Sequence, residues 1–479
     1  MDIFKSLLLC ATLLLSANTS QIAFSQTAQT KPEQTNFIVV FIDDMGWSDL
    51  SCFGNTQVET ENIDQLSKEG IRFTNFYVNA PICSPSRTAI TTGQYPYRWR
   101  ISSYLANRQE NARRGVANWL EPSAPSLARV LQAAGYATGH FGKWHMGGQR
   151  DVSEAPLIEE YGFDASLTNF EGLGPRLLPL CDAFDGKPPK PHALGSDKLG
   201  RGEITWMDRS LITEGFVTRT IDFIKSSQLA EKPFYVNVWP DDVHSPFFPP
   251  EKRRGSTKQD KYHGVLETMD EQLGKLFDFV RNDDHLRENT LILVCSDNGP
   301  EDGAGTALPL RGFKTNLYEG GIRSPLIVWG PAFIAEQKRG TTNDENYFSA
   351  MDLVPSVISI AELREDSSNR FDGEDISATL LGLQRHSRSE PICWRRPPDR
   401  PGTEDENYPD LAMRAGKWKL LTEYDGSGAQ LYDLVVDPAE QNNLAEQEPQ
   451  RVKELRMRLI AWHASMPADR GPELESDRR

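Results

Sequence analysis

Short strand-like runs rich in apolar residues alternate along the chain with segments whose apolar residues recur at helical spacing. The runs lie at 37–42, 136–141, 233–239, 291–295 and 325–329. The helical segments lie at 61–70, 126–135, 212–225, 350–361 and, as one long amphipathic helix, around 265–280. This alternation predicts an α/β fold in which helices cover both faces of a large mixed, mostly parallel sheet.

Polar side chains stand just after several of these predicted strands. In chain order they are Asp43 and Asp44, Lys143 and His145, His244, and Asp297 and Asn298. In sheets of this kind, ligands bind beyond the carboxyl ends of the strands. We therefore expect these side chains to lie along one edge of the sheet.

Two parts of the chain depart from the alternating pattern. Residues 147–210 are rich in glycine, proline and charge, which predicts long surface loops, the usual place for substrate contacts. Between about 384 and 409 the chain is polar and proline-rich, which indicates a boundary. Two strand-like pieces at 411–421 and 429–434 and an amphipathic helix follow it. We expect a catalytic domain over 36–385 and a smaller C-terminal α+β subdomain over 408–470.

The composition is that of a soluble globular protein, with 38% hydrophobic and 25% charged residues among 479. The formal net charge of −16 argues against a nucleic-acid partner, which would need a basic face. It leaves an anionic substrate open, because a local cluster of cations can outweigh the overall sign.

The first 25 residues have the features of a secretory signal peptide. Lys5 supplies the positive region, and the apolar core at 6–16 is too short to cross a bilayer. No later stretch approaches the ~20 apolar residues that a transmembrane helix needs. We expect a periplasmic or secreted protein without a membrane anchor.

The acidic residues after the strands favour a metal site. An aspartate that follows a strand is usually a turn or helix-cap residue. However, Asp43, Asp44 and Asp297, brought together with the amide of Asn298, would repel one another unless a cation lay among them. Ligands that are all oxygen indicate a hard metal, Ca²⁺ or Mg²⁺.

A group of cationic candidates points to an anionic substrate. Its members are Arg87, Lys143, His145, His244 and Lys314. Together with a metal ion, such donors suit a tetrahedral oxyanion, sulfate or phosphate, whose transition state gathers charge on its non-bridging oxygens. A lone histidine is more often structural, but His145 and His244 each follow a predicted strand, which favours a functional role.

Cys83 stands in the stretch Cys83-Ser84-Pro85-Ser86-Arg87, where Pro85 fixes the backbone and Arg87 falls one helical turn beyond the cysteine. A buried cysteine beside a turn and a thiolate nucleophile are both compatible with this stretch. The spacing fits cysteine phosphatases poorly, because their arginine comes six residues after the cysteine. A soft thiolate is also unsuited to a site of hard oxygen ligands.

The Cys-x-Pro-x-Arg stretch, followed by Thr92-Gly93, resembles the signature of the sulfatases of the alkaline-phosphatase-like superfamily. Further blocks of the same resemblance cover most of the chain: Asp43-Asp44-Met45-Gly46, Gly142-Lys143-Trp144-His145, His244-Ser245-Pro246, Ser296-Asp297-Asn298-Gly299, Lys314 with Glu319-Gly320-Gly321, Gly416-Lys417-Trp418-Lys419 and Leu431-Tyr432-Asp433-Leu434. In that family the cysteine is oxidised to formylglycine by a separate maturing enzyme. The resemblance therefore implies such an enzyme as a partner of this chain.

The resemblance also implies a ligand set. Ca²⁺ would be bound by Asp43, Asp44, Asp297 and Asn298 together with the formylglycine made from Cys83. One hydroxyl of the hydrated aldehyde would attack sulfur in line and expel the alcohol, and the second would then collapse to the aldehyde and release sulfate.

The remaining roles carried by the resemblance belong to residues that surround this hydrate. Arg87 would hold the hydrate, Asp297 would act as base for the attacking hydroxyl, and His145 would assist the elimination. His244 and Lys314 would protonate or stabilise the leaving oxygen, and Lys143 would grip a sulfate oxygen.

The expected function is hydrolysis of carbohydrate sulfates, from sulfated polysaccharide or glycosaminoglycan fragments of the galactose or N-acetylgalactosamine type. Alternatives are an arylsulfatase acting on small aryl sulfates, a phosphodiesterase or phosphonate hydrolase of the same superfamily, and a non-catalytic glycan-binding relative in which Cys83 is unmodified. The loops at 98–118 and 147–210 are expected to line the pocket mouth. In them Arg100, Arg176 and Trp206 are candidates for sugar contacts or for solvated loop positions.

Overall fold

Parallel strands form the centre of the main sheet in the computed structural model, which describes residues 34–169, 171–364, 370–399 and 408–468. The sheet has twelve strands in the order β11-β2-β10-β9-β1-β8-β3-β4-β5-β6, with β12 also pairing with β2 and β7 with β5. The five central strands run parallel and are β9 (Thr290–Ser296), β1 (Asn36–Ile42), β8 (Phe234–Trp239), β3 (Ala137–Gly142) and β4 (Ala165–Thr168). The predicted α/β class is confirmed.

The sheet is mixed towards its two ends. The outer strands are β2 (Ile71–Tyr77), β10 (Arg323–Trp329), β11 (Thr341–Asn343), β12 (Phe348–Ser349), β5 (Arg176–Cys181), β6 (Lys190–Pro191) and β7 (Ile204–Asp208). Strand β10 is antiparallel to β2 and β9, and β6 is antiparallel to β5. The prediction that 147–210 consists of loops is therefore wrong in part, since β4 to β7 lie within it. Glycines and prolines between these short strands hide their pattern from a periodicity argument.

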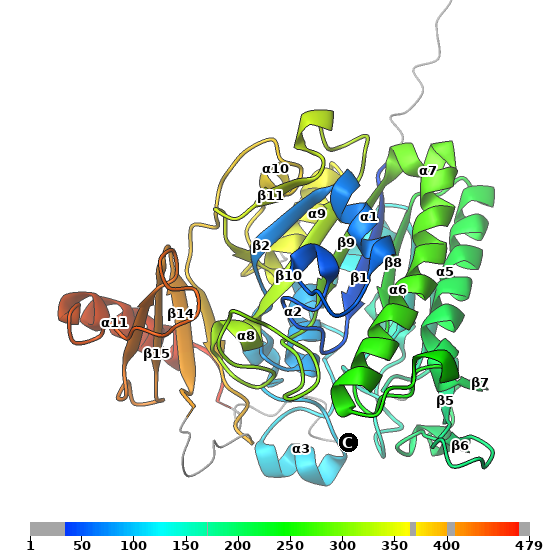
Figure 1. Cartoon of the computed structure of the whole chain (residues 1–479), viewed down its shortest axis with the longest axis horizontal. Coiled ribbons are helices and arrows are strands. Elements are labelled where there is room, and N and C mark those ends of the chain that lie inside the picture. The colour runs from blue at the N-terminus through cyan, green and yellow to red at the C-terminus, as the bar shows by residue number, and fades with distance from the viewer. Residues whose placement is uncertain (1–33, 170, 365–369, 400–407, 469–479) are drawn as a thin grey trace, which may run out of the picture. The chain divides into compact units, whose positions relative to one another are not determined.

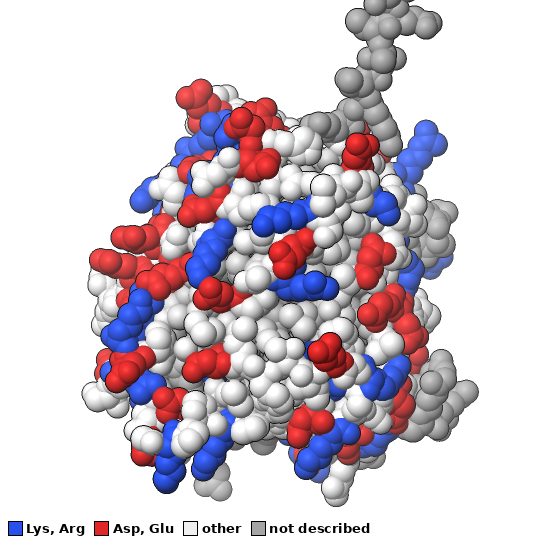
Figure 2. Space-filling view, turned by 90° about the vertical axis from the view of Figure 1, so that its right-hand side faces the viewer, with Lys and Arg blue, Asp and Glu red and all other residues white. Residues whose placement is uncertain are grey.

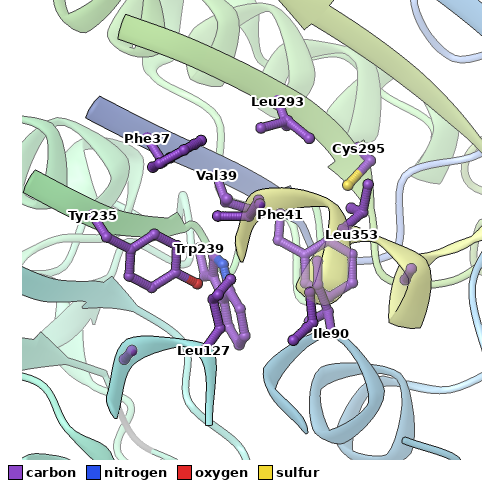
Figure 3. Close-up of a cluster of buried hydrophobic side chains, with 14 of the residues drawn as sticks. Phe37, Val39, Phe41, Ile90, Leu127, Tyr235, Trp239, Leu293, Cys295 and Leu353 are labelled. Atoms are coloured by element: carbon purple, nitrogen blue, oxygen red, sulfur yellow. The ribbon is translucent and has the colours of Figure 1, made fainter. Parts of the chain in front are cut away.

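Alternate residues of β1 enter two different cores, one on each face of the sheet. Phe37, Val39 and Phe41 pack against α2 (Cys83–Thr92), α4 (Leu127–Ala133) and α9 (Leu353–Ile360), and Figure 3 shows part of this cluster. The residues between them pack against α1 (Glu61–Glu69), α5 (Ile212–Leu229) and α6 (Lys258–Asn282), which Figure 1 shows beside the central strands. Each buried aliphatic side chain stabilises the fold by about 1.5–3 kcal/mol, so both faces must be covered.

A second, antiparallel sheet follows the main one in the chain. Its strands are β13 (Ile392–Arg395), β14 (Leu411–Ala415), β15 (Trp418–Thr422) and β16 (Gln430–Asp433), and α11 (Pro449–Ser465) packs against it (Figure 1). The predicted single strand at 411–421 is a hairpin, because Gly416, at φ +61°, allows a tight turn. Strand β13 lies within the polar stretch at 384–409. The α+β character predicted for this region is confirmed.

Four short helices complete the set of α-helices that the described residues contain: α3 (Arg108–Arg114), α7 (Asp284–Asn289), α8 (Glu319–Ile322) and α10 (Ser377–Leu380). Figure 2 shows basic and acidic side chains interspersed over the face that it presents. Every helix in the described part of the chain is too short or too polar to cross a lipid bilayer. The predicted signal peptide lies outside the described residues.

Candidate active site

The carboxyl ends of β1 and β9 bring the acidic residues together. The parallel register pairs Ile42 with Ser296, and the amide of Asp297 donates to the carbonyl oxygen of Ile42 at 2.9 Å. Beyond this pair, the amide of Asp44 donates to Asp297 Oδ1 at 3.1 Å, and Asn298 Nδ2 donates to Asp44 Oδ1 at 2.7 Å. The predicted meeting of the two strand ends is therefore present.

The end of β3 supplies Lys143 through a close backbone contact with β8. Gly142 has φ +128°, and a Cβ there would lie 1.9 Å from the carbonyl oxygen of Trp239. A larger residue would separate the strands at the point where the amide of Lys143 donates to the same carbonyl at 2.7 Å. The Lys143 Nζ then reaches Asp43 Oδ2 at 2.7 Å.

Helix α2 begins at Cys83, and its side chains are buried throughout. Arg87 lies one turn further on, as predicted from the spacing. Its Nη2 is 2.7 Å from Asp297 Oδ2 and 3.4 Å from Asp43 Oδ1, and its Nη1 donates to the carbonyl oxygen of Lys143 at 3.0 Å. Pro85 is tolerated because the first turn of a helix leaves its amides unpaired. The helix start thus faces the strand ends.

Lys314 reaches the site from the loop at 311–321, which has no regular structure before α8. The amide of Lys314 donates to the carbonyl oxygen of Pro300 at 2.9 Å, and that of Thr315 donates to Pro81 at 2.7 Å. These bonds tie the loop both to the end of β9 and to the approach to Cys83. The Lys314 Nζ lies 2.6 Å from Asp44 Oδ2.

Two histidines complete the set of predicted residues. His244 Nε2 lies 3.7 Å from Asp44 Oδ2, and its Nδ1 is 2.6 Å from the carbonyl oxygen of Ser245. His145 Nε2 faces both the carbonyl oxygen of Leu105, at 3.0 Å, and the carboxylate of Glu171. Both partners are acceptors, so Nε2 carries the proton. The buried Nδ1 of His145 has no partner among the described residues.

Charge neighbours shift the acidity of these groups in different directions. Burial would raise the pKa of Asp43, but Lys143, His244 and Arg87 hold it well below its usual range. Burial and the neighbouring Asp43 raise the pKa of Asp297 well above its usual value, against the attraction of Arg87. Burial lowers the pKa of His145 and, with help from Lys314, that of His244. Both imidazoles are therefore held towards their neutral forms.

The arrangement fits a hard cation. A carboxylate oxygen of Asp43, one of Asp297 and the Sγ of Cys83 lie within 4.8 Å of one another. Two buried oxygens, Asp43 Oδ1 and Asn298 Oδ1, accept no hydrogen bond from the described residues. Buried acceptors are normally satisfied, so oxygens left open beside other carboxylates are the donor set that Ca²⁺ prefers.

A pocket opens onto this cluster, and its lining combines predicted and unpredicted residues. The predicted ones that line it are Cys83, Lys143, His145, His244 and Lys314. The residues to which the sequence assigned no role are Ile82, Tyr104, Arg150, Glu171, His192, Leu194 and Ser245. All but Ile82 and Ser245 come from the loops at 98–118 and 147–210, which were expected to line the mouth.

The three candidate sugar contacts lie elsewhere. Arg100 is buried and donates to the carbonyl oxygen of Gly115 at 3.0 Å. Arg176 is fully buried on β5 and donates to the carbonyl oxygens of Ser196 and Gly200. Trp206 is exposed on β7 but does not line the pocket. The structure therefore places none of the three in the pocket.

Comparison with known proteins agrees with this site. The family model described as Sulfatase matches residues 35–363. The chain is 30% identical to N-acetylgalactosamine-6-sulfatase of Rattus norvegicus over 390 residues, which cover 78% of this chain and 70% of that protein. It is 28% identical to N-acetylgalactosamine-6-O-sulfatase of Bacteroides thetaiotaomicron over 500 residues, which cover 88% and 92% of the two chains.

A solved structure shares the fold. The crystal structure of Ps i-CgsB in complex with k-i-k-neocarrahexaose superposes with a TM-score of 0.73 at 23% identity, covering 90% of this chain and 92% of that chain. The family match spans both the strand ends that carry the acidic residues and the helix that begins at Cys83. The chain therefore belongs to the sulfatase family and is a sulfuric ester hydrolase.

Proposed function

We propose that the protein is an exported, calcium-dependent sulfatase that hydrolyses sulfate esters of carbohydrates through a formylglycine made from Cys83. The observation that carries this proposal is the position of Cys83 at the start of α2. From there it faces the carboxylates of Asp43 and Asp297, with Arg87 one helical turn away. The maturing enzyme that oxidises the cysteine is the implied partner.

The two groups that the chain must acquire have separate tasks. Ca²⁺, held by Asp43, Asp44, Asp297, Asn298 and the modified Cys83, would neutralise charge on the sulfate oxygens, and the aldehyde hydrate would supply both the nucleophilic hydroxyl and the hydroxyl that later releases sulfate. Asp43 Oδ1 and Asn298 Oδ1, which accept no hydrogen bond from the described residues, support this ligand set.

The chain's own residues hold and move protons around the hydrate. Arg87 is fixed by Asp297 and by the Lys143 carbonyl, so its guanidinium is oriented before substrate arrives. Asp297 would accept the proton of the attacking hydroxyl. Lys143, fixed by Asp43, would hold a sulfate oxygen.

Two further pocket residues would assist the departure of the alcohol. Lys314 and His244 both lie beside Asp44 Oδ2 and line the pocket, so either can give a proton or positive charge to the departing oxygen. His145, whose Nε2 faces Glu171 and Leu105, has its Nδ1 free to take the proton of the second hydroxyl.

A carbohydrate substrate is supported by the relatives. Two of them are named as N-acetylgalactosamine 6-sulfatases, and the structural neighbour was solved with a neocarrahexaose. A galactose or N-acetylgalactosamine sulfate is therefore the substrate class that we propose. The N-terminal apolar segment at 6–16 supports export to the periplasm or the medium.

The test begins with the intact mass of the peptide that contains Cys83, after co-expression with a formylglycine-generating enzyme. Replacement of the thiol by an aldehyde lowers the mass by about 18 Da. Full activity with a persistent thiol would refute the mechanism.

Matched assays then compare sulfated sugars with aryl sulfates and with the corresponding phosphate esters. Turnover of sulfated sugars above both is expected. Faster turnover of the phosphates would instead assign a phosphodiesterase or phosphonate hydrolase activity. An unmodified Cys83 together with no turnover of any of these substrates would instead favour the non-catalytic glycan-binding relative.

A further inference from the structure

Arg150 differs from the other strong cations at the pocket because its guanidinium is not committed to a carboxylate. It lines the pocket, and it forms no hydrogen bond or ion pair with another described residue. Lys143 and Lys314 are paired with aspartates at 2.7 and 2.6 Å. The Nε of Arg150 is buried and has no hydrogen-bond partner among the described residues, which costs free energy unless another group accepts its hydrogen bond. The position therefore suits a ligand that is not part of the chain.

The backbone fixes Arg150 in this place. Gln149, one residue before it, forms an antiparallel bridge with Glu171. On the other side, a Cβ at Gly195 would lie 2.8 Å from the carbonyl oxygen of Arg150, so the segment at 195 packs closely on it. Arg150 itself has φ +53°, a left-handed conformation that is unfavourable for a residue other than glycine. The neighbouring segments therefore hold the residue against a local preference.

Formal charges in the site show what Arg150 adds. The carboxylates of Asp43, Asp44, Asp297 and Glu171 are opposed by Arg87, Lys143 and Lys314. Each of these three cations pairs with an aspartate of the chain. Arg150 adds a positive charge that forms no ion pair with another described residue.

Glu171 is the nearest candidate for an internal partner of Arg150. Burial raises the pKa of the Glu171 carboxyl, but His145, Lys143 and, with the smallest effect, Arg150 lower it below its usual value. The carboxylate of Glu171, however, is in contact with His145 Nε2. Arg150 thus lies in reach of that charge without being bound by it.

We propose that Arg150 binds a second anionic group of the substrate, a carboxylate or another sulfate, so that the enzyme prefers sugars with two acidic groups. This inference rests on the proposed sulfatase function and names a narrower substrate class. A guanidinium presents two parallel N–H donors that match the two oxygens of a carboxylate or sulfate. A neutral sugar hydroxyl would leave most of this donor capacity unused.

Binding to the calcium-loaded Cys83→Ala variant, whose methyl side chain has no group to be oxidised to formylglycine, tests the proposal without turnover. The probes are N-acetylgalactosamine 6-sulfate, N-acetylgalactosamine 4,6-disulfate, and the 6-sulfate joined to glucuronic acid, each titrated by calorimetry in about 0.15 M salt to screen distant charges. We expect at least one of the two doubly charged probes to bind about tenfold tighter than the singly charged probe. Tighter binding of the 4,6-disulfate would indicate that Arg150 binds a sulfate, and tighter binding of the glucuronic acid conjugate would indicate that it binds a carboxylate.

Arg150 variants identify the residue responsible. Arg150→Gln should abolish the preference, because it should weaken binding of the preferred doubly charged probe by about tenfold and binding of the singly charged probe far less, whereas Arg150→Lys should retain part of the preference. Lys232→Gln removes one exposed charge before β8, at the opposite end of the sheet, and should change nothing. Thermal melting verifies that each variant is folded. The comparison of the three probes on the protein that retains Arg150 does not depend on the folding of any Arg150 variant.

Each outcome has a defined reading. Equal affinity for all three probes, or equal weakening of all three by Arg150→Gln, would overturn the role of Arg150 while the sulfatase function stood. Failure to bind any probe, together with no cleavage of sulfated sugars by the modified wild type, would overturn the proposed function and this inference with it.

Discussion

Two buried clusters of charge lie at the two ends of the loop at 311–321, and they differ in how complete they are. At one end, Lys314 joins Asp44 beside the acidic strand ends, where Asn298 Oδ1 has no hydrogen-bond donor among the described residues and the cation that pairs with Asp43 Oδ1, Arg87 Nη2, lies 3.4 Å away. At the other end, Glu319 begins α8 in a cluster whose charges pair with one another.

The second cluster joins the two sheets. Lys419 Nζ, from β15, lies 2.9 Å from Glu319 Oε1 and 2.8 Å from Glu440 Oε1. The hydroxyl of Tyr77, from β2, donates to Glu319 Oε2 at 2.6 Å, and the amide of Glu319 donates to Glu440 Oε2 at 2.6 Å. We call these four residues the junction cluster.

The difference between the two clusters indicates which one serves function and which one serves stability. Buried charges that pair with one another stabilise the fold, and removing one of them leaves its partners buried without an opposite charge. Charges left open at a pocket are available to a ligand, at some cost to the stability of the metal-free fold. We therefore expect substitutions in the site to change activity most and substitutions in the junction cluster to change unfolding most.

Cys83→Ala should produce the largest effect on activity. Removal of the nucleophile's precursor leaves positioning groups without a reacting atom, so we expect kcat to fall by about 10⁴-fold or more. Steady-state assays on a sulfated sugar measure it. Cys52→Ala, at a half-buried position outside the pocket, is the matched control and should keep its activity. Undiminished kcat in Cys83→Ala would contradict the mechanism.

Asp297→Asn should lower both the activity and the stabilisation of the protein by calcium. Loss of one carboxylate weakens calcium binding and removes the proposed base, so we expect kcat to fall by about 10³-fold. Wild-type protein should gain about 2.7 kcal/mol at a calcium concentration 100 times the Kd, seen as a higher Tm. The variant should lose most of this calcium response. A calcium response equal to that of the wild type would remove Asp297 from the ligand set.

Lys419→Met, in the junction cluster, should change the stability of the fold more than the activity. Lys419 is fully buried between two carboxylates, so its removal should lower the free energy of unfolding by about 3–5 kcal/mol. Lys417→Met is the matched control two residues away, because Lys417 is half exposed and pairs with Asp433, a contact expected to contribute about 0–1 kcal/mol. Denaturant titration compares the two. Equal destabilisation would show that the junction cluster does not stabilise the fold.

The central strands and the acidic edge of the sheet could be predicted because each depends on local pattern alone. Strands β1 and β9 are nearly unbroken apolar runs, and Asp43 and Asp297 follow them directly. Strand β2 could not be recognised in the same way, since Arg72 and Thr74 interrupt its buried residues.

Residues brought to the pocket by irregular loops were beyond local pattern. Neither Cys83 nor Lys314 follows a strand. The spacing to Pro85 and Arg87 marked Cys83, Lys314 was one of several cationic candidates, and the family resemblance supplied the roles of both. Glu171 and Arg150 reach the pocket through the bridge between Gln149 and Glu171 and through packing at Gly195. Such contacts join residues more than twenty positions apart, and no periodicity in the sequence marks them.

The junction cluster also leads us to expect a smaller effect, a change of stability with pH. Burial raises the pKa of Glu440 to about 7, with repulsion from Glu319 adding to it and attraction to Lys419 opposing it. Burial also opposes ionisation of Glu319, yet Lys419, Arg323 and Arg414 lower its pKa to about 2. The two carboxyls therefore affect stability in different pH windows.

For Glu440, the folded state holds a proton that the unfolded chain has already lost above its ordinary pKa of 4.5. The stability due to this group is thus complete below 4.5 and is lost as pH rises towards 7. Glu440→Gln has no proton to lose, so its free energy of unfolding should fall less than that of wild type across this window. Urea titrations at intervals from pH 4.5 to 8 measure the difference between the two proteins. Because Asp49 and Asp270, whose pKa values are raised to about 6, remain in both, their contribution cancels. A difference that stays constant through the window would mean that Glu440 is ionised throughout, and that the junction cluster carries one more negative charge than its burial favours.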